Sequence, residues 1–151
     1  MEGDAVVALS RAPSRRALHP VHAIFLSFAL PLNFGALISD LAYLATLHVQ
    51  WANFSSWLIA GGLFVSAFAI VWALVNLFVR RDGAAATRGR DIAYFVALLA
   101  TWIIGLVNAL IHAKDAWATM PEGLVLSVVA TVLALIATWI GFSEPSFEEG
   151  L

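Results

Sequence analysis

The sequence predicts an all-α fold, a bundle of four transmembrane helices that run alternately up and down. The composition is the first reason: 62% of the 151 residues are hydrophobic, 12% are charged, and the mean hydropathy is +0.89. A soluble domain of this size leaves much of its surface in water and could not cover so much apolar surface with so few charges. The second reason is that the apolar residues gather in four long stretches.

Each stretch has the length that crosses a membrane, because about 20 residues at a rise of about 1.5 Å span a hydrocarbon layer of about 30 Å. Lipid offers the backbone no hydrogen-bond partner, so each stretch must be a helix. The helices form one domain, residues 19–143, between a polar N-terminal tail, 1–18, and a short acidic C-terminal tail, 144–151. The predicted helices cover residues 24–47, 57–79, 92–113 and 124–142.

The basic residues predict how the bundle is oriented. Three arginines lie in the N-terminal tail and four follow the second helix, whereas the connection 48–56 has none and the last connection has only Lys114. The positive-inside rule then places both termini in the cytoplasm, and Trp51, Trp57 and Trp117 form an aromatic belt on the outer side. We expect a multi-pass protein of the bacterial cytoplasmic (inner) membrane with the lipid bilayer as a partner. A net charge of −2 does not favour nucleic-acid binding.

Several kinds of chemistry are excluded or not indicated. The chain has no cysteine, which excludes disulfides, thiolate metal sites, cysteine-ligated iron–sulfur clusters and covalently attached c-type haem. The sequence contains no nucleophile–base arrangement, no phosphate-binding loop and no paired carboxylates, so hydrolysis and phosphoryl transfer are not indicated. The question of an enzyme stays open, and a non-catalytic protein is favoured.

The first helix carries a polar face within the membrane. Asp40 lies in its outer half, where a carboxylate is costly and must face protein or water or be protonated. At about 100° per residue, His22, Asn33 and Asp40 fall on the same side of the helix. This stripe runs from the cytoplasmic edge to the outer leaflet.

The third helix carries a matching stripe, spaced 4, 3 and 4 residues apart: Thr101, Gly105, Asn108 and His112. Asn108 lies at a depth close to that of Asp40, so we expect these two side chains to approach each other. His112 and Asp115 are three residues apart and are expected to pair at the outer end of the helix.

The second and fourth helices have stripes of small or polar residues, which let transmembrane helices approach closely. We interpret these stripes mainly as packing surfaces. They are Gly62, Ser66, Ala69, Ala73 and Asn76 in the second helix, and Ser127, Thr131, Ala134, Thr138 and Gly141 in the fourth.

The four histidines are candidate cofactor ligands. A b-type haem needs two axial histidines at similar depth on different helices, and only His48 with His112 meets that condition. His19 and His22 have a spacing that suits a metal, but a third ligand is missing nearby. The alternative for His19 is helix capping, because His19-Pro20 opens a helix well.

Five segments together resemble the bacterial membrane family catalogued as domain of unknown function 2231. The resemblance covers roughly His19 to Phe142 and implies a four-helix inner-membrane module, some relatives of which are joined to or near Rieske-type or cytochrome-type redox domains. One departure is that Ala23 follows His22, where relatives often have a second His-Pro. The family's residues carry over to His19, His22, Asp40, Asn108, His112 and Asp115. The segments are residues 19–22 (HPVH), 35–43 (GALISDLAY), 51–62 (WANFSSWLIAGG), 108–117 (NALIHAKDAW) and 121–127 (PEGLVLS).

The sequence leaves three functions open. The first is a non-catalytic accessory or anchor subunit of a membrane complex, with a redox or respiratory assembly suggested by the resemblance, that docks a membrane-protein partner or a second copy of itself. The second is a b-haem or quinone-linked electron carrier that uses His112. The third is a small proton or solute conduit lined by His22, Asn33 and Asp40.

Overall fold

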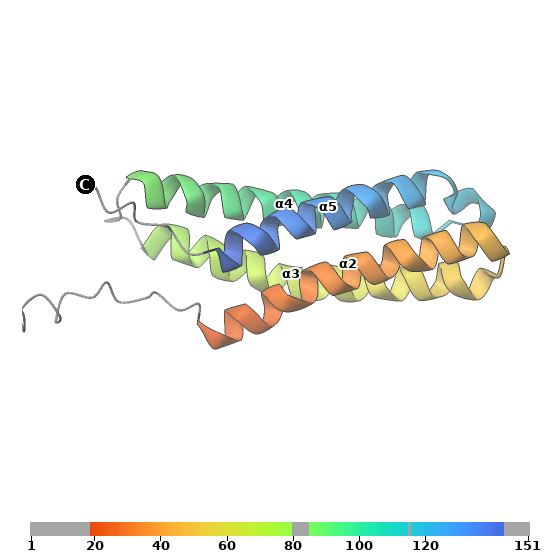
Figure 1. The fold of residues 1–151 in the computed structure, drawn as a ribbon, viewed down its shortest axis with the longest axis horizontal. Coiled ribbons are helices and arrows are strands. Elements are labelled where there is room, and N and C mark those ends of the chain that lie inside the picture. The colour runs from red at the N-terminus through yellow and green to blue at the C-terminus, as the bar shows by residue number, and fades with distance from the viewer. Residues whose placement is uncertain (1–18, 80–84, 115, 144–151) are drawn as a thin grey trace, which may run out of the picture.

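The computed structural model describes residues 19–79, 85–114 and 116–143. Within these ranges the chain forms four long helices and one short 3-10 helix, and no strand (Figure 1). The two terminal tails and Asp115 lie outside the described residues, as does the side chain of Trp117. The elements are α2 (Pro20–Thr46), α3 (Val49–Val79), α4 (Ala85–His112), η1 (Ala116–Thr119) and α5 (Glu122–Phe142).

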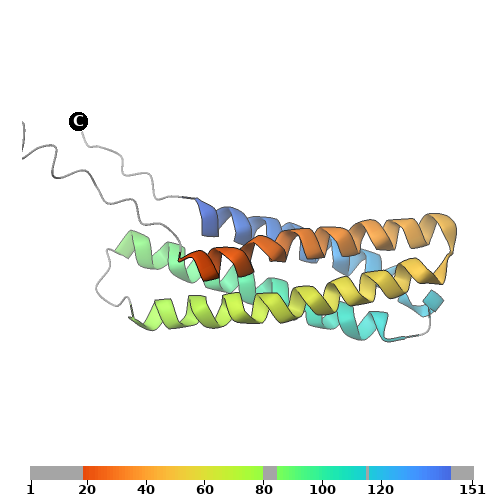
Figure 2. The same ribbon diagram turned by 90° about the horizontal axis from the view of Figure 1, so that it is seen from below.

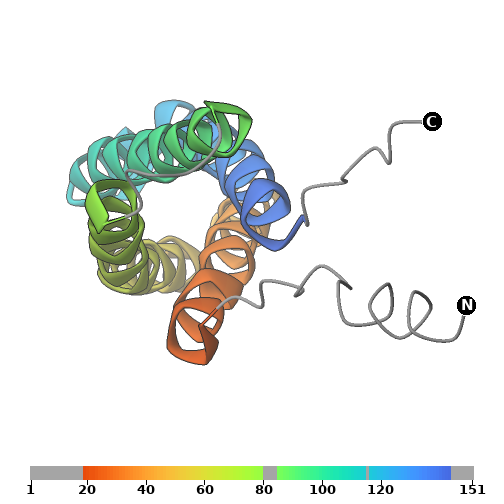
Figure 3. The ribbon, with the colours of Figure 1, turned by 90° about the vertical axis from the view of Figure 1, so that its left-hand side faces the viewer.

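Consecutive long helices run antiparallel, and the four helices form a ring when viewed along the bundle (Figure 3). α2 packs against α3 and α5, and α4 packs against the same two helices. The start of α2 and the end of α5 lie at one end of the bundle, here called the terminal end (Figures 1 and 2). The α2–α3 connection and η1 lie at the other, the far end. All four long helices are apolar enough to cross a membrane, so the expected four-helix, multi-pass fold is confirmed.

All four long helices begin earlier than the apolar stretches predict, α5 by only two residues. α2 begins at Pro20 rather than at residue 24, and α4 begins at Ala85 rather than at residue 92. The largest correction concerns residues 48–56, which were expected to form a connection between helices. α3 begins at Val49 and includes all of them except His48. The apolar stretch marks only the part of a helix that lies in lipid, whereas the helix itself continues while each added residue gains a backbone hydrogen bond.

The ends of α2 show what stops a helix here. At its start, the Nδ1 atom of His19 accepts a hydrogen bond from the backbone N–H of Val21 at 3.3 Å, and Pro20 occupies the first turn, where its missing N–H costs nothing. At its end, Leu47 adopts a left-handed conformation (φ 59°) and its N–H bonds to the carbonyl of Tyr43. This turn sends the chain directly into α3.

The interior of the bundle is built from small and polar residues, and the large apolar side chains point outward. Ala29, Ala69 and Ala134 are fully buried, whereas Trp57 and Trp139 are 72% and 74% exposed. Small residues allow the helices to approach closely, and large side chains outside meet the lipid. The stripes of α3 and α5 pack as the sequence predicts. Polar groups therefore have only the interior in which to find partners.

Candidate functional site

The far half of the bundle holds a buried carboxylate paired with an imidazole. The Nε2 atom of His112 in α4 lies 2.9 Å from the Oδ1 atom of Asp40 in α2. The side chain of His112 is 2% exposed and that of Asp40 is fully buried. A lone carboxylate at this depth would be costly, so the pairing explains how Asp40 is tolerated in a transmembrane helix.

The second carboxylate oxygen of Asp40 is held by a relay of two further side chains. The hydroxyl of Ser127 in α5 donates to Oδ2 at 2.5 Å, and the side-chain amide of Asn108 donates to the oxygen of Ser127 at 2.8 Å. Asp40 and Asn108 thus lie in one network but are joined through Ser127. From the sequence, Ser127 is interpreted mainly as a packing residue.

The imidazole of His112 is fixed on both sides. Its Nδ1 atom lies 3.0 Å from the backbone carbonyl of Asn108, and Nε2 lies 3.3 Å from the hydroxyl of Ser55 in α3. Ser55 also donates to the carbonyl of Ala36. With Ser55 included, all four long helices contribute to the cluster. Asp40, Ser55, Asn108, His112 and Ser127 are hereafter called the far cluster.

The hydrogen bonds determine where protons can reside in the far cluster. A carbonyl oxygen only accepts, so Nδ1 of His112 must carry a proton for its bond to Asn108. One further proton lies between Nε2 of His112 and Oδ1 of Asp40, on either atom, and the pair is then neutral overall. Because Ser127 donates to Oδ2, a proton on Asp40 would sit on Oδ1 and face His112. Losing that proton leaves one buried negative charge.

A glycine makes room for the imidazole. A Cβ atom at Gly123 in α5 would lie 2.8 Å from Cε1 of His112 and 2.8 Å from Cγ2 of Thr119. Such distances are well inside van der Waals contact, so any larger residue here would displace the ring or the helix. Gly123 is therefore a positioning residue for His112.

The expected partner of His112 was a neighbour in sequence. Asp115 lies outside the described residues, and the structure pairs His112 with Asp40 across the bundle. Asp40 and His112 lie on parallel helices and are 72 residues apart in the sequence. Partner choice here depends on how α2 and α4 face each other, which local spacing does not encode.

A second polar cluster lies at the terminal end. The Nε2 atom of His22 is 2.8 Å from the hydroxyl of Tyr94, again across 72 residues. The rings of His22 and His19 lie 5.8 Å and 4.7 Å from the ring of Trp72 in α3. His22 is buried and His19 is exposed. His22, Tyr94, Trp72 and His19 are hereafter called the terminal cluster.

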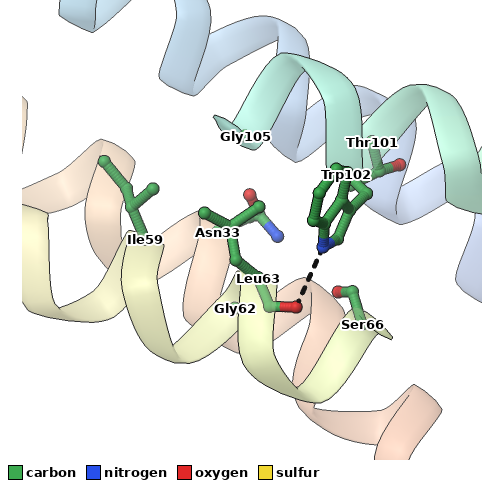
Figure 4. A pocket seen from close by; sticks show the side chains of 8 residues that line it. All are labelled: Asn33, Ile59, Gly62, Leu63, Ser66, Thr101, Trp102 and Gly105. Carbon is green, nitrogen blue, oxygen red and sulfur yellow. Dashed lines mark hydrogen bonds between the residues drawn. The ribbon is translucent and has the colours of Figure 1, made fainter. Parts of the chain in front are cut away.

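Asn33 lies between the two clusters, beside a small cavity in the middle of the bundle (Figure 4). Its amide donates to the carbonyl of Ala29, and its own backbone carbonyl accepts from Thr131 in α5. His22, Asn33 and Asp40 all face the interior, as the helical phase predicts, but they bond to different partners. They mark three levels of the bundle rather than one site.

Apolar layers separate these levels from one another and from the far end. Leu26 and Leu98 are fully buried and form one apolar layer. Leu26 lies between His22 and Asn33 along α2, so this layer separates those two levels. Tyr43, Ala52 and Met120 form a second layer beyond Asp40 toward the far end. The far cluster is therefore covered by side chains towards the far end of the bundle.

The comparison with known proteins identifies the family. A family model described as predicted membrane protein (DUF2231) matches residues 18–146. The chain belongs to this family. No curated protein and no solved structure gives a significant match. Membership confirms the resemblance that the sequence segments indicate, and the family description supports a membrane protein of unknown function.

The residues present do not fit a b-type haem. His48 is exposed at the α2–α3 connection, and both ring nitrogens of His112 already contact protein groups. The cavity in the bundle centre, about 10 Å³, is far smaller than a porphyrin. Among the described residues no group of three or more His, Cys, Asp or Glu could hold a metal ion. His19 caps α2, and the Nε2 atom of His22 contacts Tyr94.

Proposed function

We propose that this family member is a small non-catalytic membrane module that binds protons at the Asp40–His112 pair and passes them along the interior of the bundle. The observation that carries the proposal is the 2.9 Å contact between a buried carboxylate and a buried imidazole in a transmembrane bundle. Ionisable groups at membrane depth are costly and commonly mark ion or proton pathways. This function corresponds to the conduit hypothesis, with protons as the transported species.

The far cluster has the properties that a proton-holding site needs. The pair is neutral with the shared proton in place and carries a buried charge without it, so the proton leaves only when another group or a water takes it up. The terminal cluster offers a second titratable group, His22, on the same face of α2. With the orientation that the basic residues predict, the terminal end faces the cytoplasm and the far cluster lies in the outer half of the bilayer.

The apolar layers limit how fast protons can move. Leu26 and Leu98 lie between His22 and the centre, and Tyr43 with Met120 covers the far cluster. Protons cross such layers only when water enters transiently. We therefore expect a slow, gated proton flux rather than an open channel.

Proteoliposomes with a trapped pH-sensitive dye test this function. With valinomycin and a potassium gradient as the driving force, wild-type protein is expected to acidify or alkalinise the lumen faster than protein-free liposomes. Asp40→Asn should reduce the rate to that of the protein-free control, because the amide cannot share a proton with His112. The matched control is Asp91→Asn, which changes the half-buried carboxyl near the start of α4. A wild-type rate equal to that of empty liposomes would contradict the proposal.

A second candidate is the accessory or anchor subunit of a membrane complex, in the bacterial inner membrane and with a redox assembly suggested by the resemblance. The observation that favours it is that the far cluster joins all four helices at one level, which makes the bundle a rigid body. A membrane-protein partner or a second copy would then contact lipid-facing residues such as Trp57, Phe64 and Trp139.

Purification in mild detergent distinguishes the two candidates. An anchor is expected to co-purify with a stoichiometric partner, or as an oligomer, in wild-type and Asp40→Asn forms alike. A monomer that carries a proton flux sensitive to Asp40→Asn would favour the proton function and count against the anchor.

A further inference from the structure

We infer that the cavity in the middle of the bundle is a binding site for a single water molecule, held by Ser66 and Asn33, that links the terminal end to the far cluster. The cavity lies among α2, α3 and α4 (Figure 4). The water site stands on the geometry alone, whereas its part in proton transfer rests on the function proposed above.

Ser66 in α3 supplies the first argument. It is 2% exposed, and its hydroxyl makes no hydrogen bond to any part of the chain that the structure describes. The other buried serines differ: Ser39, Ser55 and Ser127 all donate to an oxygen at 2.5 to 3.2 Å. Figure 4 shows the Ser66 hydroxyl beside the cavity, facing Trp102. Buried hydroxyls are nearly always satisfied by protein or ordered water, so this one points to a ligand.

Asn33 supplies the second partner for a water. Its amide nitrogen donates one hydrogen to the carbonyl of Ala29, which leaves a second N–H, and Figure 4 shows this nitrogen on the side of Trp102 and Ser66. A buried water makes about two to four hydrogen bonds, and the Ser66 hydroxyl can both donate and accept. The hydroxyl of Thr101 also lines the cavity but is directed at the carbonyl of Ala97.

The size and walls of the cavity limit the ligand to water. Its volume is about 10 Å³, close to the minimum for one water molecule and too small for a larger solute. The indole N–H of Trp102 is bonded to the carbonyl of Leu63 at 3.1 Å, so the indole forms a wall without competing for the water. Among the species a conduit could carry, this constriction favours protons over solutes.

The position of the cavity gives the water its role. Asn33 is seven residues from Asp40 on α2, about two helical turns or 10 Å. On the other side, Leu26 and Leu98 separate the cavity from His22 and Tyr94. A water at this level places a proton donor and acceptor between the two clusters, where the side chains alone leave a long gap.

Nuclear magnetic resonance of the protein in nanodiscs detects the water directly. We expect a cross-peak between the Asn33 side-chain amide protons and a long-lived water. Ser66→Val, which replaces the hydroxyl and fills the cavity with a methyl group, should abolish the cross-peak and lower the proton flux at least several-fold. Ser39→Ala is the matched control, because Ser39 is equally buried but bonds to its own helix at Gly35; it should retain both the cross-peak and the flux.

Thermal unfolding of Ser66→Ala gives a second, independent measurement. If a water satisfies the hydroxyl, its removal loses a hydrogen bond and should lower the melting temperature by about 2–4 °C. If the hydroxyl has no partner, its removal should raise the melting temperature, which would overturn the water site.

The outcomes separate this inference from the proposed function. A missing cross-peak in wild-type protein overturns the water site, whatever the flux. A cross-peak in a protein that moves no protons supports the water site and overturns the proposed function. Normal flux in a Ser66→Val variant that has lost its cross-peak overturns the role of the water in the proton path.

Discussion

The far cluster and the terminal cluster both link α2 to α4, but only the far cluster buries a carboxyl group. Each joins a residue of α2 to a residue 72 positions later in α4: Asp40 to His112, and His22 to Tyr94. The far cluster recruits side chains from all four helices, whereas the terminal cluster pairs an imidazole with a phenol and stacks the imidazole on Trp72.

The difference follows from the cost of the groups being buried. A carboxyl that can ionise must have each oxygen satisfied, because an unpaired charge in the interior costs several kcal/mol. Asp40 accordingly has a partner on each oxygen. His22 and Tyr94 are joined by a hydrogen bond and by ring contacts, and groups that stay uncharged lose less free energy on burial than a carboxylate. The partners on both oxygens of Asp40 therefore reflect the charge that the far cluster has to hold.

The largest effect is expected from removing the carboxylate. Asp40→Ala leaves the imidazole of His112 and the hydroxyl of Ser127 without their shared partner, and should lower the free energy of unfolding by roughly 3 kcal/mol. Denaturant unfolding in detergent, followed by circular dichroism, measures the change. The double variant Asp40→Ala/His112→Leu should lose less than the sum of the single variants, because the two residues interact directly. Strictly additive losses would show that the pair is not coupled.

The next effect tests whether the space around His112 matters as much as its hydrogen bonds. Gly123→Ala places a methyl group 2.8 Å from the imidazole and should cost about 1–3 kcal/mol, as overpacking does. Gly89→Ala in α4 is the control, because a Cβ there meets nothing within 4 Å. That variant should gain up to about 1 kcal/mol from better helix propensity. Equal effects of the two substitutions would mean that His112 is not tightly held.

How much of this comparison the sequence could predict depends on how local each feature is. Helix number and type follow from the apolar stretches, and the inward face of His22, Asn33 and Asp40 follows from helical phase. These are properties of single segments. The partner of His112 is not a property of a single segment, because it depends on which sides of α2 and α4 face each other. The sequence favoured Asp115 only because it is close to His112 along the chain.

Two cluster residues that the sequence analysis missed left a signal in the stripes. Ser55 lies seven residues before Gly62, and so extends the small-residue stripe of α3 by two turns. It was overlooked because the connection 48–56 was not expected to be helical. Tyr94 lies seven residues before Thr101 and extends the polar stripe of α4 in the same way. Continuing each stripe towards the start of its helix would have found both, Tyr94 within the predicted stretch and Ser55 just before it.

A smaller effect is expected at the terminal cluster. Tyr94→Phe removes one hydrogen bond to His22 and keeps the ring contacts, so it should cost about 0.5–1.5 kcal/mol. The same unfolding experiment measures it. If the terminal cluster also serves the proton path, the variant should slow proton flux while leaving the far cluster intact. A stability loss as large as that of Asp40→Ala would show that the two clusters bury groups of equal cost.

The smallest effect on stability is expected at His48, a histidine that is exposed whereas the side chain of His112 is buried. His48 is exposed at the far end, where its backbone N–H bonds to the hydroxyl of Thr46 and its carbonyl accepts from the N–H of Trp51. His48→Gln should therefore change the free energy of unfolding by less than about 0.5 kcal/mol, as surface substitutions do, and should leave proton flux unchanged. His112→Gln, in contrast, removes the imidazole from the shared proton and should abolish flux. A loss of flux in His48→Gln would place a proton step at the α2–α3 connection and move the functional site out of the bundle interior.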